Sequence, residues 1–357
     1  MNPPDFRARI VPIDPAVASA ARARIDSLTK PLGSLGKIEA LAVRLCAMVG
    51  GTPRHFFEQR AILIGAGDHG VAAEGVSAYP PEVTAQMVGG FLAGFAAINT
   101  FARAVDADVY VANFGVREAL APHPALLDVN VGYGTFNLAR TPAIKRDDLD
   151  YTIAAGIAAF DEVMERKPFD IIALGEMGIG NTTSAAAIVA AFTGKPVREV
   201  VGRGTGIDDA RLAIKIAAIE RGLARCHDFT WDEIASQVGG YEIVGLAGVL
   251  LCAARARIPV LLDGFIVSAA ALIAARIAPA SIDYCIAAHR SQEPGHAFAL
   301  AALGLDPLFD LDLRLGEGSG AALAFPIVEA AARMVAEMKT FEEAGVAGKD
   351  PAAPQTV

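Results

Sequence analysis

The chain has 357 residues, of which 53% are hydrophobic and 20% are charged, and its formal net charge is −9. This length is ample for a buried core in one large domain or two smaller ones. The acidic balance argues against nucleic acid as a partner, because phosphate backbones require a basic surface. It does not exclude a small phosphorylated ligand, since backbone amides bind phosphate without an excess of lysine.

Apolar residues spaced three and four apart predict helices over Val17–Asp26 and Lys37–Met48, separated by a turn at Pro31–Gly33. From about residue 60, short apolar runs alternate with alanine-rich helical stretches. This alternation is typical of parallel strands that are buried on both faces by crossover helices. The runs are Ala61–Ile64, Val109–Ala112, Ile171–Leu174, Ile258–Leu262 and Tyr284–Ala288.

The most apolar stretch, residues 241–278, does not predict a membrane span, because a spanning helix needs roughly 20 consecutive apolar residues. Five charged residues interrupt it, namely Glu242, Arg255, Arg257, Asp263 and Arg276. The last element, residues 320–339, is predicted as a long helix that either kinks at Pro326 or begins near it. The first residues, Met1–Phe6, lack the charged start and apolar run of a secretory signal.

The four cysteines favour free thiols over a metal site or disulfides. Cys46, Cys226, Cys252 and Cys285 are widely scattered and form no CxxC pair. Buried thiols in a reducing cytoplasm are the simplest interpretation, and zinc is not expected. We therefore expect a cytoplasmic globular protein.

The predicted fold class is α/β, with a parallel Rossmann-like sheet flanked by helices and a small helical lobe built from both chain ends. The expected parts are N-terminal helices at 1–58, an α/β substrate-binding domain at 59–315, a C-terminal helix at 316–347 that completes the lobe, and a disordered tail at 348–357.

Polar residues follow the predicted strands. Ligands of open α/β sheets bind beyond the carboxyl ends of the strands, so these residues either share a site or are ordinary turn residues. They are Asp68, His69, Asn113, Glu176, Asp263, His289 and Ser291. The Asp68–His69 pair also suggests a nucleophile–histidine–acid arrangement, but the chain has no G-x-S-x-G elbow, so a hydrolase is disfavoured.

Two glycine-rich loops each lead into a helix. The first, Leu174–Thr183, either offers helix N-terminal amides to a phosphate or only caps the helix, and it lacks the lysine of a P-loop. The second, Val201–Asp209, either binds an anion or is a capping turn with Asp208 or Asp209 as the N-cap. In the helix that follows, Lys215 either reaches an anion or, as we expect, is a solvated charge.

The segment Arg314–Gly320 places Glu317 between glycines just before the last helix. Burial would raise the pKa of Glu317 and make it a competent general base. The alternative is a first-turn carboxylate stabilised by the helix dipole. Upstream, the stretch Gly75–Met87 joins an aromatic, a hydroxyl and an amide that either hold a flat heterocycle or are ordinary loop residues.

Six short motifs follow one another along the chain between about residues 25 and 345. They are Lys30–Gly36, Gly67–Val71, Glu74–Ser77, Gly178–Thr183, Leu262–Phe265 and Leu315–Ala321. Together they resemble the nicotinate-nucleotide–dimethylbenzimidazole phosphoribosyltransferase family. The resemblance implies a homodimer that moves the 5-phosphoribosyl group of nicotinate mononucleotide to 5,6-dimethylbenzimidazole. The products are α-ribazole 5′-phosphate and nicotinate, in the assembly of the lower ligand of cobalamin.

The resemblance also implies roles for individual residues, with Glu317 as the catalytic base. The residues implied to hold the phosphoribosyl group are Glu176, Gly178, Gly180, Asn181, Thr182, Thr183, Gly202, Gly204, Lys215, Asp263 and Ser291. Those implied to hold the benzimidazole are Ser77, Tyr79, Gln86, Met87 and Leu315. The implied chemistry inverts the anomeric carbon and requires neither a metal nor an organic cofactor.

Two other functions remain to be separated from this one. A related transferase would use another acceptor, such as adenine or a phenolic ring. A non-catalytic nucleotide sensor would bind nicotinate mononucleotide without consuming it, although the intact segment around Glu317 argues against this alternative.

Overall fold

The structure is a computed structural model of the chain, and it describes residues 9–347. The expectations for the first six residues and for a disordered tail at 348–357 lie outside the described residues. The described chain divides into two compact units, one formed by residues 9–12 and 58–325 and the other by residues 13–57 and 326–347.

The larger unit is built on a parallel sheet of six strands in the order β3-β2-β1-β4-β5-β6. The strands are β1 (Arg60–Gly67), β2 (Ala107–Gly115), β3 (Leu126–Leu127), β4 (Ile171–Met177), β5 (Val260–Leu262) and β6 (Cys285–Ala287). All residues of β4 except the last are buried, as expected for a strand covered on both faces. The predicted parallel α/β sheet is confirmed.

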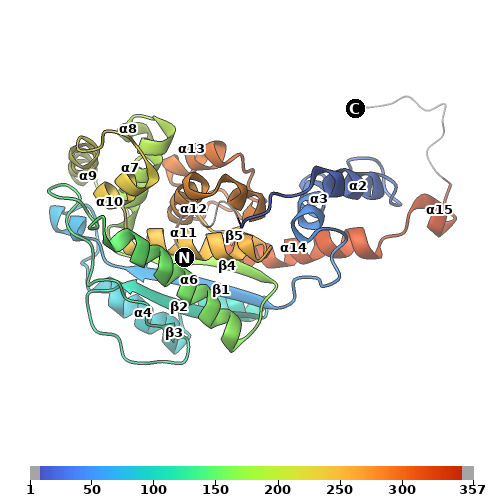
Figure 1. The fold of residues 1–357 in the computed structure, drawn as a ribbon, viewed down its shortest axis with the longest axis horizontal. Coiled ribbons are helices and arrows are strands. Elements are labelled where there is room, and N and C mark those ends of the chain that lie inside the picture. The colour runs from blue at the N-terminus through green and yellow to red at the C-terminus, as the bar shows by residue number, and fades with distance from the viewer. Residues whose placement is uncertain (1–8, 348–357) are drawn as a thin grey trace. The chain divides into compact units, whose positions relative to one another are not determined.

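Helices cover both faces of this sheet (Figure 1). Helix α4 (Val83–Ala93) packs against β1, β2 and β4, and α11 (Tyr241–Arg255) packs against the same strands from the other face. The remaining elements of this unit are η1 (Gly70–Glu74), α5 (Ala97–Ala104), α6 (Asp148–Arg166), α7 (Asn181–Thr193), α8 (Val197–Val200), α9 (Asp209–Leu223), α10 (Trp231–Val238), α12 (Phe265–Ile277), η2 (Pro279–Tyr284) and α13 (Pro294–Leu303).

The order of the strands places the site. The chain leaves β1 toward β2 on one side and reaches β4 on the other side, so the crossover direction reverses between β1 and β4. A crevice opens beyond the carboxyl ends of parallel strands at such a switch point. The loops that follow β1, β4, β5 and β6 therefore meet at the edge of the sheet where ligands are expected.

The smaller unit is helical and uses both ends of the chain. It contains α2 (Pro15–Asp26), α3 (Lys37–Val49), α15 (Phe341–Ala344) and the second part of α14 (Ser319–Glu337). Arg24 ties the two chain ends together by donating to the Glu343 carboxylate at 3.0 Å and to the Met338 carbonyl at 3.0 Å. Pro326 lies inside α14, which begins seven residues before it, so the helix does not start at the proline.

Two segments reach the length and hydropathy of membrane-spanning helices by composition alone, Val83–Ala104 and Ser319–Glu337. The first consists of α4 and α5 with Gly94 in a left-handed conformation between them. In the second, 61% of the most apolar window is buried inside the protein. Core helices of soluble proteins pass the same test, so these segments are weak evidence for a membrane span. The four cysteines are buried and form no disulfide in the described part of the chain, as predicted.

Candidate active site

A cavity of about 580 Å³ lies beyond the carboxyl ends of β4, β5 and β6. That volume is in the range of small-molecule sites, roughly 300–1,000 Å³. Its walls combine apolar and polar groups from the switch-point loops. The lining includes Tyr79, Val83, Met87, Glu176, Ile179, Asn181, Thr182, Gly204, Thr205, Asp263, Phe265, Ile266, His289, Ser291, Glu293, Arg314, Leu315 and Glu317.

Glu317 lies in this cavity on a tight turn that runs over the end of β4. Its φ of 65° is in the left-handed region, where a non-glycine residue is strained. The turn touches the strand so closely that a Cβ on Gly175 would lie 2.4 Å from the backbone carbon of Glu317. The glycine in β4 is thus required by the turn that carries the carboxylate.

Glu317 is buried, with 6% of its surface exposed. Burial raises the pKa of Glu317, and the charge of Asp263 raises it further, while a hydrogen bond from the Ile98 amide at 3.4 Å opposes the rise. Ile98 lies in the first turn of α5, so the positive end of that helix faces the carboxylate. A carboxyl whose pKa is raised toward neutrality is suited to act as a general base.

Asp263 holds the turn of Glu317 in place. Its two carboxylate oxygens accept hydrogen bonds from three backbone amides, those of Gly318 at 3.2 Å, Gly320 at 2.7 Å and Ala321 at 3.0 Å. The side chain thereby caps the N-terminus of α14, where amides lack partners within the helix. Asp263 follows β5, so the strand, the turn and the last helix are joined at one carboxylate.

Glu176, like Glu317 and Asp263, is a buried carboxyl group, and it lies near the end of β4. Burial raises its pKa to about 8, helped by the charges of Asp263 and Glu242 and opposed by a hydrogen bond from the Asn181 side chain. Glu176 is therefore mostly protonated at neutral pH. In that form it can donate a hydrogen bond into the cavity, which an ionised carboxylate cannot do.

Replacing Glu176 with glutamine is expected to stabilise the protein at alkaline pH. Since the pKa of Glu176 rises from an ordinary 4.5 to about 8 on folding, its neutral form favours the native state at low pH. This contribution is lost as the pH rises through about 8, where the wild-type protein must bury a charge. A tenfold change in proton affinity corresponds to about 1.4 kcal/mol, so the variant should gain at most roughly 5 kcal/mol above that pH. Denaturant melts of both proteins at pH 5 and 9 would measure the difference, and equal gains at both pH values would contradict this account.

His289, Ser291 and His296 fix the loop after β6. The His289 Nε2 atom lies 3.5 Å from the Asp263 carboxylate. Burial pulls the pKa of His289 down, but the hydrogen bond and charge of Asp263 outweigh it and raise the pKa above its ordinary value. Burial lowers the pKa of His296 to about 3, so this ring is neutral, and its Nδ1 accepts from the Ser291 amide at 2.9 Å. Ser291 thereby lines the cavity in a fixed orientation.

The two glycine-rich loops form another part of the cavity wall. The N-terminus of α7 begins at Asn181, and Asn181 and Thr182 line the cavity. Asp208 is the N-cap of α9, one of the two candidates that the sequence left open, and its side chain accepts from the Arg211 amide. The amide of Gly204 donates to the Glu293 carboxylate at 3.0 Å.

The expectation that Lys215 is a solvated charge is wrong. Its side chain is fully buried, and its ammonium group donates to Thr182 Oγ1 at 2.8 Å and to the Gly202 carbonyl at 3.1 Å. Burial lowers the pKa of Lys215 to about 8, an effect that the charge of Glu293 opposes. The helical position of the lysine gave no sign of this, because one of its two partners, Thr182, lies 33 residues away in the chain.

The five residues expected to hold a flat ring do not all lie in one place. Tyr79, Met87 and Leu315 line the cavity beside Glu317. Gln86 lines a separate hollow with Leu92, on the outer side of α4. Ser77 is not among the cavity-lining residues, and its hydroxyl instead lies 3.3 Å from that of Thr205.

The polar strand ends also separate into two groups. Glu176, Asp263, His289 and Ser291 meet in the cavity. The others hold loops: Asp68 accepts from the Arg117 amide, Asn113 accepts from the Val116 amide, and His69 Nε2 lies 2.6 Å from Glu242. Glu242 was seen in the sequence only as an interruption of an apolar stretch. Among residues 9–347, no cluster of histidine, cysteine, aspartate and glutamate is arranged to hold a metal ion.

A helix N-terminus, a buried lysine close behind it and a buried carboxylate at one switch-point cavity suit a transferase acting on a phosphorylated sugar. The comparisons agree with this class, since residues 10–346 match the model of a family described as phosphoribosyltransferase. The nicotinate-nucleotide–dimethylbenzimidazole phosphoribosyltransferase of Chloroflexus aggregans is 52% identical over 345 residues, which are 96% of this chain and 97% of that one. The enzyme of the same name from Roseiflexus sp. is 52% identical over 344 residues, with the same coverage.

A solved structure gives the same result. The crystal structure of the enzyme of this name from Thermus thermophilus matches with a TM-score of 0.90 and 47% identity, covering 94% of this chain and all of that one. The chain belongs to the nicotinate-nucleotide–dimethylbenzimidazole phosphoribosyltransferase family. The resemblance found in the sequence is thereby confirmed.

Proposed function

We propose that this enzyme transfers the 5-phosphoribosyl group of nicotinate mononucleotide to 5,6-dimethylbenzimidazole in the switch-point cavity, with Glu317 as the base. The observation that carries the assignment of roles is the position of Glu317, a buried carboxyl group with a raised pKa, in the cavity that the two glycine-rich loops also line. The products are α-ribazole 5′-phosphate and nicotinate.

The phosphate of the donor binds between the N-terminus of α7 and the loop at 202–204. The helix contributes the partial positive charge of its N-terminus, and Thr182 contributes a hydroxyl. The ammonium group of Lys215 donates to Thr182 and to the Gly202 carbonyl, so its positive charge lies close to the anion and stabilises it. Ser291 supports the same group from the loop after β6.

The ribose lies next to the phosphate, over the buried carboxyls of Glu176 and Asp263. Protonated Glu176 can donate to a ribose hydroxyl, and its negative neighbours favour a sugar carbon that becomes positively charged. The transition state resembles an oxocarbenium ion, because the pyridinium of nicotinate is already a good leaving group.

The acceptor lies against apolar side chains on the Glu317 side of the cavity. Tyr79, Met87 and Leu315 offer flat and flexible apolar surface to a benzimidazole ring. One ring nitrogen attacks the anomeric carbon from the face opposite to nicotinate. The bond from that carbon to the pyridine nitrogen breaks, and its electron pair stays on nicotinate. Glu317 takes the proton from the other benzimidazole nitrogen, so the product is neutral at the new base.

The enzyme is proposed to work as a cytoplasmic homodimer without a metal or organic cofactor, as the resemblance to the family implies. Each step of the reaction uses only the two substrates and side chains of the chain, with the largest contribution from positioning two rings on opposite faces of the sugar. Light scattering of the purified protein would give the mass of the assembly.

Incubating the purified protein with nicotinate mononucleotide and a panel of acceptors tests the proposal. Nicotinate release that depends on dimethylbenzimidazole, with a product of the mass of α-ribazole 5′-phosphate, is the expected result. Faster transfer to adenine or a phenol would identify a related transferase with another acceptor. Binding of the donor without release in the presence of any acceptor would identify a sensor and refute the proposal.

A further inference from the structure

Two loops that line the cavity are hydrogen-bonded to each other through a single hydroxyl group. Thr205, in the loop at 202–208, accepts from the Ala78 amide at 2.8 Å and lies 3.3 Å from the hydroxyl of Ser77. Ser77 in turn accepts from the amide of Tyr79 at 3.1 Å, and Tyr79 lines the cavity. The loop proposed to hold the donor phosphate thus contacts the loop that presents an aromatic ring to the acceptor.

We propose that Thr205 is a positioning residue that couples the two substrate sites, so that a phosphate bound at the loop 202–208 increases the affinity for the acceptor. This inference rests on the proposed function, because it takes the two loops as the donor and acceptor sites of one reaction. It assigns Thr205 no chemical step.

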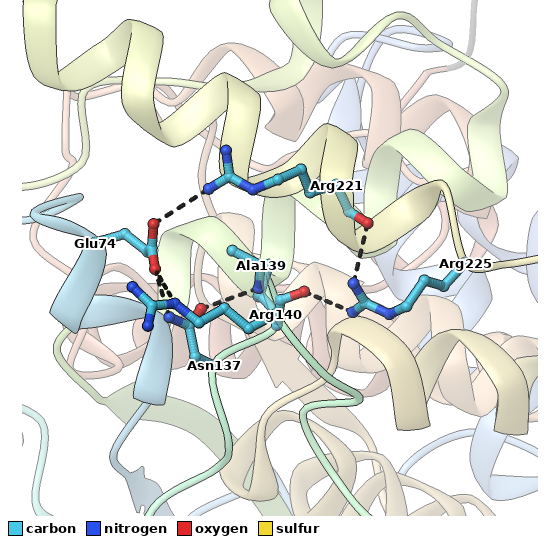
Figure 2. A network of polar contacts seen from close by, with 7 residues as sticks. Glu74, Asn137, Ala139, Arg140, Arg221 and Arg225 are labelled. Atoms are coloured by element: carbon cyan, nitrogen blue, oxygen red, sulfur yellow. Dashed lines mark hydrogen bonds and ion pairs between the residues drawn. The ribbon is translucent and has the colours of Figure 1, made fainter.

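The loop that carries Tyr79 is fixed at both of its ends. At the start, Glu74 accepts from Asn137 at 2.7 Å and Arg140 at 2.9 Å, and it pairs with Arg221 at 3.2 Å (Figure 2). At the far end, Thr84 accepts from the Ile179 amide at 3.1 Å. These contacts place the ends of the loop but leave its tip, residues 77–79, to other interactions.

The tip is held from the phosphate side. Among the described residues, its side-chain hydrogen bonds to other segments come from Thr205 and from Arg211, which donates to the Ser77 carbonyl at 3.0 Å. Thr205, Ala78 and Tyr79 are exposed residues, so apolar packing contributes little to their placement. The position of the tip therefore depends mainly on these polar contacts.

Helix α9 connects the two loops along its length. Near its start Arg211 reaches the loop tip, one turn later Lys215 reaches the phosphate loop, and near its end Arg221 reaches Glu74. Helix α9 also packs against η1, which leads into the Tyr79 loop. A rearrangement of the phosphate loop against this helix is thus transmitted to the tip, because both are bonded to the same element.

The phosphate loop has a reason to change when an anion binds. The amide of Gly204 donates to the carboxylate of Glu293, whose other oxygen, Oε2, is buried and has no hydrogen-bond partner in the described part of the chain. A phosphate at this loop competes with Glu293 for the amide and repels its charge. Gly204 directly precedes Thr205. The position of the Thr205 hydroxyl therefore depends on whether the Gly204 amide binds the Glu293 carboxylate or a phosphate.

An anion that fixes the loop at 202–208 also fixes the tip that is bonded to Thr205. Less entropy is then lost when the acceptor binds against the tip, which gives positive coupling. By linkage, the acceptor increases the affinity for the anion by the same factor. We expect a factor of about 5 or more, the lower range of typical coupling between sites.

Calorimetric titration of dimethylbenzimidazole with and without saturating inorganic phosphate tests the coupling in the intact enzyme. In the wild type, phosphate should lower the acceptor Kd by about 5-fold or more. Thr205→Val keeps the shape but removes the hydroxyl, so the ratio of the two Kd values should fall to near one, with an unchanged thermal midpoint because the residue is exposed. Thr205→Ser restores the hydroxyl and should restore the ratio. Arg211→Met, which removes the second contact, should lower the ratio while keeping Thr205.

The same ratio in Thr205→Val and in the wild type would overturn the inference, and so would a wild-type ratio of one. These results are distinct from a failure of the proposed function. If the wild type releases nicotinate with dimethylbenzimidazole but shows no coupling, only the role of Thr205 is refuted. If no acceptor supports nicotinate release, the proposed function itself is refuted.

Discussion

Replacing Glu317 with glutamine is expected to lower kcat by about 10²–10⁴-fold, the usual contribution of a positioned general base. Glutamine has the shape of glutamate but cannot take the proton that the attacking benzimidazole must lose. The KM for nicotinate mononucleotide should change little, because the proposed donor contacts lie on the loops around Thr182 and Gly204 rather than at residue 317. Steady-state kinetics of nicotinate release would measure both constants.

The variant should fold normally, which makes the loss of activity interpretable. The amide oxygen of glutamine can still accept from the Ile98 amide, and the strained backbone at residue 317 suits glutamine no worse than glutamate. A matched control is Glu165→Gln, which removes an exposed carboxylate of α6 and should keep wild-type activity. Turnover by Glu317→Gln within a few-fold of the wild type would show that another group takes the proton.

The pH dependence provides a second readout for the same residue. Burial raises the pKa of Glu317 above its ordinary 4.5, and only its ionised form can act as a base. The wild-type kcat should therefore fall as the pH is lowered through this raised pKa, and the residual activity of the glutamine variant should lack that decline. A decline that persists unchanged in the variant would assign it to a different group.

The sequence was sufficient to predict those parts of the fold that depend on local patterns. All five predicted apolar runs overlap a strand, since a strand buried on both faces must be continuously apolar. The two-residue strand β3 had no signal of its own. The glycines around residue 317 were equally informative, because the turn requires positive φ at residues 316 and 318.

Contacts between distant segments could not be predicted in this way. Lys215 lies on an amphipathic helix where a lysine is normally solvated, but its ammonium group donates to Thr182, 33 residues away in the chain, as well as to the loop that precedes the helix. Glu242 and His69 are 173 residues apart in the chain, yet they are in contact at 2.6 Å. Thr205 resembles any loop threonine until the Tyr79 loop is seen beside it. Burial and pairing of charges depend on topology, which a single sequence with local periodicity does not specify.

Asp263→Asn is expected to reduce both activity and stability, although Asp263 need not touch the reacting atoms. The carboxylate accepts from three backbone amides, whereas an asparagine side chain has a single acceptor oxygen. If that oxygen faces Gly320 and Ala321, the side-chain NH2 group faces the amide of Gly318, and two donors oppose each other. The turn that carries Glu317 must then shift.

A displacement of about 1 Å can cost roughly 100-fold in rate, so kcat should fall by that order. Loss of the Asp263 charge also removes one cause of the raised pKa of Glu317, which should become a weaker base. The unsatisfied amide should lower the free energy of unfolding by about 1–3 kcal/mol. Kinetics and denaturant melts of the same preparation would measure the two effects, and the acid decline of kcat should move to lower pH.

The matched control is Asp150→Asn, an identical change in the first turn of α6 and away from the cavity. Asp150 is exposed, so its loss should change the free energy of unfolding by less than about 1 kcal/mol and leave kcat intact. A destabilised Asp263→Asn protein with wild-type kcat and an unmoved acid decline would mean that the aspartate only caps α14. A fall in kcat together with a shifted acid decline instead requires that the aspartate sets both the position and the basicity of Glu317.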